Sequence, residues 1–524
     1  MFLSLILLPI IFWAQTQRWT YQYNWQGSVY NGANYIVRGP DGNLYTAGYT
    51  YNNYTYLDIL MLSLTSTGSE RWVYHYDRNE SNDQINALIL GADNNLYAAG
   101  FTSYTLGDFA IIKMSLSDTV RWMYNYDGPA NYADEANDVV YGADGNIYAC
   151  GESGGIGTDM DFTVISLDTL GTLRWVYRFN GNANSEDIAR SIIYGNDGNL
   201  YITGVTRDTA NHSNLTVISL TTSGNQRWIY NYDGPTDMSG EGNAIIWGND
   251  GNLYVAGKSF TLGNTYDFTV LSLTATGNQR WVYNTHGTDV WEDIANKLVY
   301  GNDGNIYAVG KLANVATDDD IYVVSFTPSG TVRWQYCPQD SGMDASTSIC
   351  YGGDGNIYIS ERTDNFPSTR YDFTITSLTT TGSVRWTYNY DGPAHNDEAA
   401  TSVIYGNDGY LYATGTTALS NNSSNYLVIS LNPASGMQEN KTSISLDRSS
   451  LTVYPNPAKT YFNIQLPQNA DCSEIKIFDI TGKQVKSEEL KGKNCRVSLF
   501  GIQNGVYFVQ VGDEVMKNKL IVNK

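Results

Sequence analysis

One acidic residue recurs along this sequence at a constant distance from a glycine-containing turn. It lies eight positions before the turn glycine in most repeats, as Asp83, Asp134, Asp187, Asp293, Asp344 and Glu398, with Glu241 displaced by one position and Asn31 in the first repeat. If the following strand lines a channel, these side chains surround one mouth and attract cations or a basic ligand. The alternative is that each carboxylate accepts backbone N–H groups in its own loop, and its repetition favours this structural role.

A second motif, Gly151-Glu152-Ser153-Gly154-Gly155, has the spacing of a hydrolase nucleophile. A nucleophile elbow needs a helix after the serine and a histidine delivered nearby. No helical pattern follows Ser153, and the equivalent positions in other repeats hold Thr or Ser. We therefore interpret Ser153 as part of a repeated strand end and predict no catalytic residues.

A polysaccharide-acting lyase or hydrolase is the alternative function, and it would need loops that differ between repeats. The loop from His286 to Asp293 is the first place to look for such a site. Trp291 in this loop lies outside the repeated Arg-Trp pairs and is a candidate for ligand stacking. The candidate ligand-binding residues are thus Asp134, Asp187, Glu241, Trp291, Asp293, Asp344 and Glu398.

Metal and cofactor motifs are weak in this sequence. Turns such as Asn302 to Asn305 offer oxygen ligands, but they lack the downstream glutamate and flanking helices of an EF-hand. The five cysteines are an odd number and include no CxxC pair. We predict no metal and no cofactor.

The elements that position these residues are repeated units. A Gly-x-Asp-Gly-Asn-(Leu/Ile)-Tyr turn recurs eight times at intervals of 51 to 54 residues, and an Arg-Trp pair follows the same period. Each unit contains four strand-like pieces, which is the content of one propeller blade. The piece Arg18 to Trp25 precedes the first complete unit, whereas the last unit, Asn396 to Leu431, lacks an Arg-Trp pair. The N-terminal strand is therefore expected to complete the last blade.

The predicted fold is all-β. An eight-bladed β-propeller is expected over residues 16–432, with the Arg-Trp strands outermost and the strands that begin like Ala136 at the axis. The sequence Gly251-Asn252-Leu253-Tyr254-Val255-Ala256-Gly257 resembles the core of the bacterial SBBP-type β-propeller repeat. This resemblance implies the fold and brings no activity with it.

The period stops after Leu431. Residues 433–447 have the composition of a linker, and the alternation of apolar and polar residues over 448–524 predicts a small Ig-like β-sandwich. The latter stretch resembles the type A C-terminal sorting domain of the type IX secretion system of Bacteroidetes-like bacteria. The matching residues are Tyr454, Pro455, Asn456, Pro457, Gly482, Gly505, Tyr507 and Lys519. The resemblance implies the type IX secretion machinery as a partner.

Export is also indicated at the other end of the chain. Residues 1–15 contain an apolar run that is too short to span a bilayer and is typical of a signal peptide. The net charge of −22 disfavours nucleic acid and anionic membranes as partners. We predict a monomeric protein without a membrane span, secreted or held at the outer-membrane surface. Its expected role is that of a binding or scaffold module, with glycans or surface proteins as candidate partners.

Overall fold

The computed structural model describes residues 17–25, 28–52, 56–78, 81–103, 107–236, 238–261, 265–338, 342–364, 371–420, 423–434, 452–454, 456–465, 474–479, 483–489, 494–511 and 516–523. The predicted signal peptide, 1–15, and nearly all of the predicted linker, 433–447, lie outside these residues. The described residues form strands and no helix, as predicted. The chain divides into two compact units, 1–439 and 440–524.

The first unit is built from four kinds of strand. The inner strands are β2 (Tyr30–Arg38), β6 (Asp83–Leu90), β10 (Asp134–Tyr141), β14 (Ile188–Tyr194), β18 (Gly240–Trp247), β22 (Ile294–Tyr300), β26 (Ala345–Tyr351) and β30 (Ala399–Tyr405). The second strands are β3 (Leu44–Asn52), β7 (Asn95–Thr102), β11 (Ile147–Gly154), β15 (Asn199–Arg207), β19 (Asn252–Thr261), β23 (Ile306–Asn314), β27 (Asn356–Asp364) and β31 (Leu411–Ser420).

The two remaining kinds lie further from the axis. The third strands are β4 (Tyr56–Leu64), β8 (Asp108–Ser115), β12 (Met160–Leu167), β16 (Ser213–Thr221), β20 (Thr265–Thr274), β24 (Asp318–Phe326), β28 (Tyr371–Thr379) and β32 (Ser423–Leu431). The outer strands are β5 (Glu70–Tyr76), β9 (Val120–Tyr126), β13 (Leu173–Phe179), β17 (Gln226–Tyr232), β21 (Gln279–Thr285), β25 (Val332–Tyr336), β29 (Val384–Tyr390) and β1 (Gln17–Tyr23).

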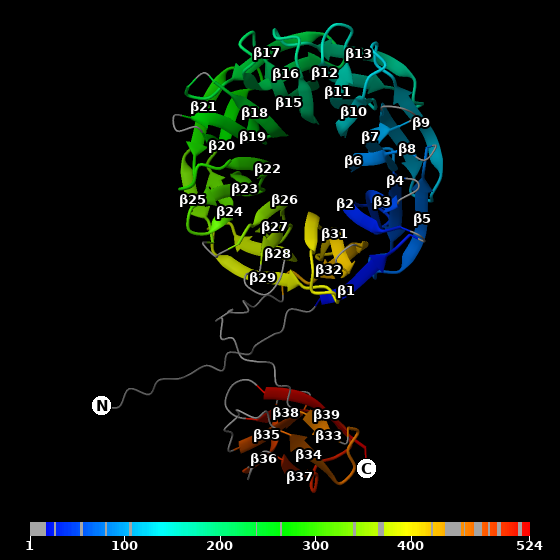
Figure 1. The fold of residues 1–524 in the computed structure, drawn as a ribbon, viewed down its shortest axis with the longest axis vertical. Coiled ribbons are helices and arrows are strands. Elements are labelled where there is room, and N and C mark those ends of the chain that lie inside the picture. Colours follow the sequence, from blue (N-terminus) through cyan, green and yellow to red (C-terminus); the bar gives the residue numbers. More distant parts are fainter. Residues whose placement is uncertain are drawn as a thin grey trace, which may run out of the picture. The chain divides into compact units, whose positions relative to one another are not determined.

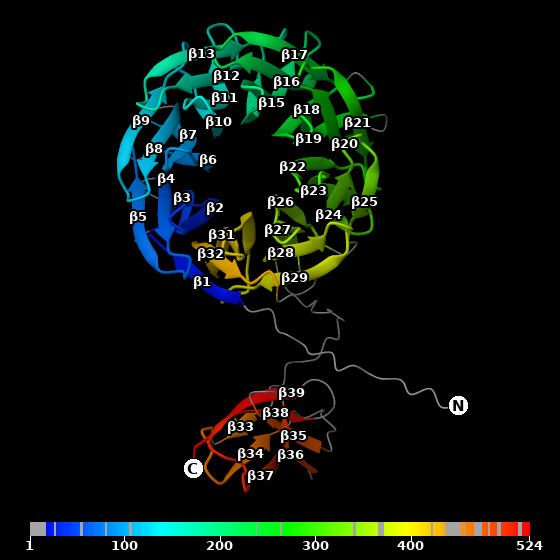
Figure 2. The same ribbon diagram turned by 180° about the vertical axis from the view of Figure 1, so that it is seen from behind.

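These strands form sheets arranged around a central axis, with the inner strands toward the centre and the outer strands at the perimeter (Figure 1 and, from behind, Figure 2). Among the described residues there are six four-stranded sheets and one eight-stranded sheet in this unit. In the larger sheet, β32 and β2 are joined by a single parallel residue pair, Ser424 with Tyr30. A count of eight blades therefore depends on treating the larger sheet as two.

The N-terminal strand completes the last group, as predicted. Strand β1 pairs antiparallel with β32 from Gln17–Leu431 to Tyr23–Tyr426. The pairing covers the edge of β32 with a strand from the other end of the ring, so this group has an outer strand like the other groups.

Tryptophan side chains join neighbouring groups at the perimeter. Trp122 Nε1 donates to Thr169 O (3.1 Å) in the turn before the next outer strand. Gly171 of the same turn has a positive φ of 83°, and a Cβ there would lie 2.8 Å from the indole of Trp122. The turn needs glycine for both reasons.

Polar side chains join neighbouring inner strands close to the axis. Each inner strand has a bulge, and in β10 it lies between Ala136 and Asp138. The extra residue, Asn137, donates from Nδ2 to Ala189 O of β14 (2.9 Å). Bonds of the same kind are Asn86 to Ala136 O, Asn243 to Ala295 O, Asn296 to Ser346 O, Thr347 to Ala400 O and Thr401 to Ala33 O.

The second unit contains two small sheets. One has the order β33 (Thr452–Tyr454), β34 (Tyr461–Gln465), β37 (Asn494–Ser498), and the other β36 (Gln484–Glu489), β35 (Glu474–Asp479), β38 (Gly505–Val511), β39 (Met516–Val522). Phe462 and Val497 of the first sheet share a buried cluster with Ile477 and Val509 of the second. The two sheets thus pack on one core.

Candidate functional site

The repeated acids lie inside the loops that connect one group to the next. Asp134 Oδ2 accepts a hydrogen bond from Gly128 N (2.7 Å), and its Oδ1 accepts one from Gly154 N (3.1 Å). Asp293 does the same with Gly287 N (2.9 Å) and Ala313 N (2.6 Å). Each carboxylate therefore ties the incoming loop to the end of the second strand.

The same position is buried in the other units. Asp187 accepts from Gly181 N and Arg207 N, Asp344 accepts from Asp364 N (2.7 Å), and Glu398 accepts from Ala418 N (3.1 Å). Side-chain exposure is at most 3% for this set, which consists of Asp83, Asp134, Asp187, Asp293, Asp344 and Glu398. Burial raises the pKa of Asp187 and Asp293 to about 6. These contacts are the ones that a structural role in the loop requires.

Two of the candidate ligand-binding residues lie elsewhere. In the fifth unit Gly240 occupies the acid's position, because it pairs with Ser259 as Asp134 pairs with Ser153. Glu241 follows it and forms ion pairs with Arg190 (2.9 Å) and Lys258 (3.4 Å). Trp291 is 70% exposed. The structure therefore does not bring the seven candidates together in one site.

A polar cavity of about 470 Å³ is lined by residues from several inner strands. Its lining includes Tyr35 of β2, Glu135 and Asp138 of β10, Arg190 of β14 and Lys297 of β22. These strands lie nearest the axis of the ring (Figure 1). We call this space the axial cavity.

Carboxylates crowd one wall of the axial cavity. Glu135 and Glu152 are direct partners across β10 and β11, so two like charges face each other. Burial and the charge of Glu135 raise the pKa of Glu152 to about 7. Burial also raises the pKa of Asp138, while the ammonium group of Lys297 acts in the opposite direction.

The axial cavity breaks the symmetry of the repeat. Positions equivalent to the pair Glu135–Glu152 hold Gly32–Tyr49, Gln84–Phe101, Ile188–Val205, Glu241–Lys258, Ile294–Lys311, Ala345–Arg362 and Ala399–Thr416. Sequence reasoning had emphasised the similarity of the units and missed this variation. The signal was present in the residue that follows each repeated acid, which changes its chemistry from unit to unit.

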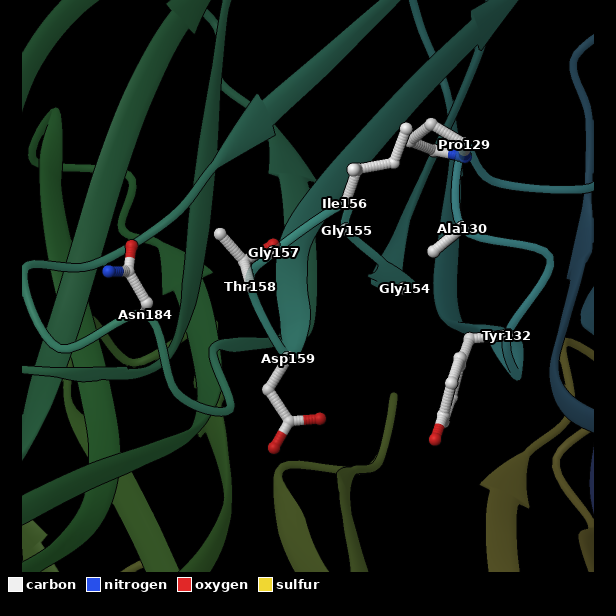
Figure 3. Close-up of a pocket in the computed structure, with 10 residues that line it drawn as sticks. All are labelled: Pro129, Ala130, Tyr132, Gly154, Gly155, Ile156, Gly157, Thr158, Asp159 and Asn184. Carbon is white, nitrogen blue, oxygen red and sulfur yellow. The ribbon is translucent and has the colours of Figure 1, made fainter.

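A larger pocket of about 730 Å³ lies among the loops of the third and fourth units. Figure 3 shows Tyr132 on one side, Asp159 and Asn184 toward the other, and the Gly154–Gly157 segment between them. Tyr132 is 63% exposed and Ile156 is 78% exposed. We call this space the loop groove. It offers an aromatic ring, a glycine-rich floor, a carboxylate and an amide to a ligand.

Ser153 lies beside the loop groove but is fully buried. Its hydroxyl accepts a hydrogen bond from Arg178 Nη1 (2.6 Å), and the chain continues through a turn into β12. The nucleophile geometry, which needs a helix and a histidine, is thus not formed around Ser153 in the described part of the chain.

The histidines lie in different units, with His75 in strand β5 and His286 and His395 in loops. His75 Nε2 lies 3.1 Å from Asp58 Oδ2, His286 Nδ1 lies 2.7 Å from Gly287 O, and His395 Nδ1 lies 2.7 Å from Asp391 Oδ2. In the loop from His286 to Asp293, Glu292 forms an ion pair with Lys258. His286 and Glu292 of this loop thus have different partners, Gly287 O and Lys258.

Among the residues that the structure describes, two groups of three carboxylates have the spacing of cation ligands. They are Asp58, Asp77 and Asp83, and Asp372, Asp391 and Glu398, with the carboxylate oxygens of each group within 4.8 Å of one another. The sequence did not reveal these groups, because Asp58 and Asp372 lie in third strands while their partners lie at or beside the following loops, and only the fold makes them neighbours.

The sorting-motif residues lie in the second unit. Tyr454, Asn456 and Pro457 are exposed, whereas Tyr507 is 9% exposed and donates from its hydroxyl to Gln503 O (3.0 Å). Gly505 begins β38, and Lys519 lies in β39. The predicted motif residues Pro455 and Gly482 lie outside the described residues.

Comparisons with known proteins identify the second unit. Residues 452–523 match the secretion system C-terminal sorting domain. The chain is also 36% identical over 70 residues to Beta-agarase A of Zobellia galactanivorans, a match that covers 13% of each protein. The chain thus spans only a small part of that relative's length.

Solved structures resemble the chain only distantly. A protein of unknown function from Dyadobacter fermentans is 10% identical with a TM-score of 0.39, covering 80% of this chain and 98% of the other. One from Bacteroides caccae is 12% identical with a TM-score of 0.31, covering 56% and 94%. Within the described residues, no helix has the length and apolar character needed to cross a membrane. The chain therefore joins a ring of antiparallel sheets to a type IX secretion C-terminal sorting domain, which marks it for export to the cell surface or the extracellular space.

Proposed function

We propose that the ring is a binding module that takes a neutral saccharide in the loop groove at the cell surface or outside the cell. The observation that carries this proposal is the groove itself, where the exposed ring of Tyr132 lies opposite Asp159 and Asn184 (Figure 3). Exposed loops on a rigid scaffold are frequent binding sites.

The chemistry of the groove favours a sugar. An exposed tyrosine presents an apolar face and a polar tip, which suits the C–H face and hydroxyl groups of a pyranose. The carboxylate of Asp159 and the amide of Asn184 supply hydrogen-bonding groups for hydroxyls. The net charge of −22 disfavours polyanionic polysaccharides as ligands.

Binding of the full mature chain to a panel of neutral polysaccharides tests this proposal. Replacement Tyr132→Ala is expected to weaken binding by about two- to tenfold, since one stacking contact is worth roughly 0.5–1.5 kcal/mol. The matched control is Tyr56→Ala, because Tyr56 is 51% exposed but begins strand β4 and does not line the groove. Equal affinities for the two variants would contradict the proposal.

The sorting domain has its own test. We propose that the secretion machinery is its partner, as the match over residues 452–523 supports. Removal of residues 440–524 is expected to keep the ring from crossing the outer membrane, so that it stays within the producing cell. Surface labelling and fractionation measure the outcome, and unchanged export of the truncated chain would contradict the assignment.

A second candidate function is acid–base hydrolysis of a polysaccharide in the axial cavity. The supporting observation is the pair Glu135–Glu152, since a carboxyl group with a pKa of about 7 can act as a proton donor near neutral pH. Release of reducing ends from agar-type and related polysaccharides tests it. Loss of turnover in Glu152→Gln, with binding in the loop groove unchanged, is the expected result for this function.

A further inference from the structure

The residue two positions before each loop acid differs between the units. Counted from Asn31 in the first unit and from Gly240 in the fifth, these residues are Val29, Ser81, Tyr132, Ser185, Met238, Trp291, Gly342 and Asn396. An aromatic residue holds this position in the third and the sixth units alone. Because Tyr132 lines the loop groove, Trp291 is the equivalent of a groove residue in the sixth unit.

The neighbouring hairpin extends this equivalence. Glu152 of the third unit corresponds to Lys311 of the sixth, since each pairs with the residue that follows the loop acid. Four residues further along the chain lie Ile156, which is 78% exposed, and Val315, which is 71% exposed. Both units thus hold an aliphatic side chain in solvent at the tip of the hairpin between the second and third strands.

The same count places a carboxylate at both tips. Asp159 and Asp318 lie seven residues after Glu152 and Lys311, and both are exposed. The sixth unit therefore repeats three features of the loop groove, which are an aromatic ring, an aliphatic side chain and a carboxylate. The third and sixth units, β10–β13 and β22–β25, lie on different sides of the ring (Figure 1).

Hydrogen bonds hold the loop that carries Trp291 against this hairpin. Asp289 N donates to Ala313 O (3.1 Å), and Val315 N donates to Thr288 Oγ1 (3.2 Å). A loop that is already fixed loses little conformational entropy when a ligand binds to it. The indole is thus presented to solvent from a supported position.

The exposure of Trp291 is unusual within this protein. Its side chain is 70% exposed, whereas the other tryptophans that the structure describes are buried or partly buried. Val290, next to it in the chain, is also 70% exposed. Apolar side chains gathered on a loop are typical of a binding surface. An indole offers a broad stacking face, and the carboxylate of Asp318 can accept hydrogen bonds from sugar hydroxyls.

We propose that the sixth unit holds a second site for a neutral saccharide, formed by Trp291, Val315 and Asp318. This inference rests on the proposed binding of a saccharide in the loop groove, whose chemistry it extends to another unit. The ring then has two sites on different sides, so that two segments of polysaccharide can bind one molecule at once.

Tryptophan fluorescence reads the sixth-unit site directly. The full mature chain is titrated with neutral hexasaccharides of β-linked glucose, mannose and galactose, each in turn. A hexasaccharide stacked on Trp291 is expected to protect tryptophan emission from quenching by acrylamide. Trp291→Tyr should lose this protection and still bind by calorimetry, because tyrosine supplies the stacking ring that the third unit has at Tyr132.

Calorimetry measures the contribution of the indole. In a chain that carries Tyr132→Ala, the further change Trp291→Ala is expected to weaken the remaining binding by about two- to tenfold. Met238→Ala is the matched control, because Met238 holds the same position in the fifth unit, is 42% exposed and has no aromatic ring. Its affinity should equal that of the chain with Tyr132→Ala alone.

The two proposals fail in different ways. Binding that Tyr132→Ala weakens, without protection of tryptophan emission in the wild type, would overturn the sixth-unit site and leave the loop groove. Protection of emission, with an affinity that Tyr132→Ala does not change, supports the sixth-unit site and contradicts the loop groove. Absence of binding to every hexasaccharide would overturn both. Protection by a chitosan hexasaccharide alone would identify a cation on the indole and overturn the assignment of a neutral ligand.

Discussion

At the scale of single residues, an arginine, a tyrosine and an aspartate form the same cluster in most units. In the fourth unit Arg227 Nη1 donates to Tyr201 OH (3.0 Å) and Ser219 Oγ (2.8 Å), and Tyr201 OH donates to Asp197 Oδ2 (2.7 Å). In the second unit Lys113 takes part instead, with Nζ 2.9 Å from Asp93 Oδ2. A buried tyrosine hydroxyl thus joins the hairpin turn to the outer strand.

Removal of that hydroxyl should destabilise the ring. Tyr201→Phe is expected to lower the free energy of unfolding by about 1–2 kcal/mol, because both Asp197 and Arg227 lose a hydrogen-bond partner. Urea denaturation measures the change. Tyr132→Phe, at a ring that is 63% exposed, should change the midpoint very little. Equal effects of the two variants would contradict this role.

The buried loop acids should make stability depend on pH. Burial raises the pKa of Asp187 and Asp293 from 3.8 to about 6 and that of Glu398 from 4.5 to about 7. The folded state then holds these protons more tightly than the unfolded state, so this stability is complete below the unfolded values and is lost as pH rises through the folded ones.

The urea midpoint, measured in EDTA, is therefore expected to fall between about pH 4 and pH 7. Asp293→Asn should reduce that fall, because the side chain no longer titrates. Asp168→Asn is the matched control, because the hydrogen bond that Thr172 N donates to the partly exposed Asp168 lowers the pKa of Asp168, so its titration lies below this window. A fall that is unchanged in Asp293→Asn would contradict the assignment.

Sequence reasoning located the repeated acids and favoured a structural role in the loop from their repetition alone, without evidence for the direction of each side chain. Asp134 has the same type and spacing whether it faces a channel or its own loop, and only the positions of Gly128 N and Gly154 N decide the matter. The pair Glu135–Glu152 was missed for a related reason. Glu135 and Glu152 become neighbours through the register of β10 and β11, which composition does not reveal.

At the scale of elements, the hairpin turns were predictable because their chemistry is local. Gly251 has a positive φ of 77°, and a Cβ there would meet no atom within 4 Å. The cost of a side chain at this position is therefore one of backbone conformation. In the second unit, Asn94 occupies the same turn position with a φ of 58°.

Gly251→Ala should accordingly cost about 1 kcal/mol of unfolding free energy, because alanine disfavours positive φ. Gly251→Asn should cost less, since asparagine tolerates this region and already occupies it at Asn94. Thermal and urea unfolding of both variants measure the order. A variant Gly251→Asn that is less stable than Gly251→Ala would contradict the explanation.

The inner-strand bulges were not predicted, although they decide which side chains enter the axial cavity. A bulge adds one residue to the strand, so the period of two that assigns side chains to faces breaks at Asn137. No residue type in the sequence marks a bulge reliably, since the extra position holds Asn, Arg or Thr in different units.

At the scale of the whole molecule, the ring is held closed by strand β1. Removal of residues 17–23 should lower the Tm and promote aggregation, because β32 would be left as an open edge. Removal of residues 440–524, a separate compact unit, should leave the unfolding transition of the ring in place. Differential scanning calorimetry of the two truncated chains compares them. A ring that melts unchanged without β1 would show that the closure is dispensable.

The axial hydrogen bonds between inner strands have a consequence for the history of this architecture. Asn137 supplies a donor to the next strand, and Ala136 O of the same strand accepts from Asn86 of the preceding one. Both halves of such a connector are present in β10, β22, β26 and β30, whereas Arg190 of β14 bonds to the side chain of Asn243 instead. A gene segment duplicated or deleted between equivalent codons of these units would preserve the joint, so unequal recombination among them can change the number of units without first creating a new interface.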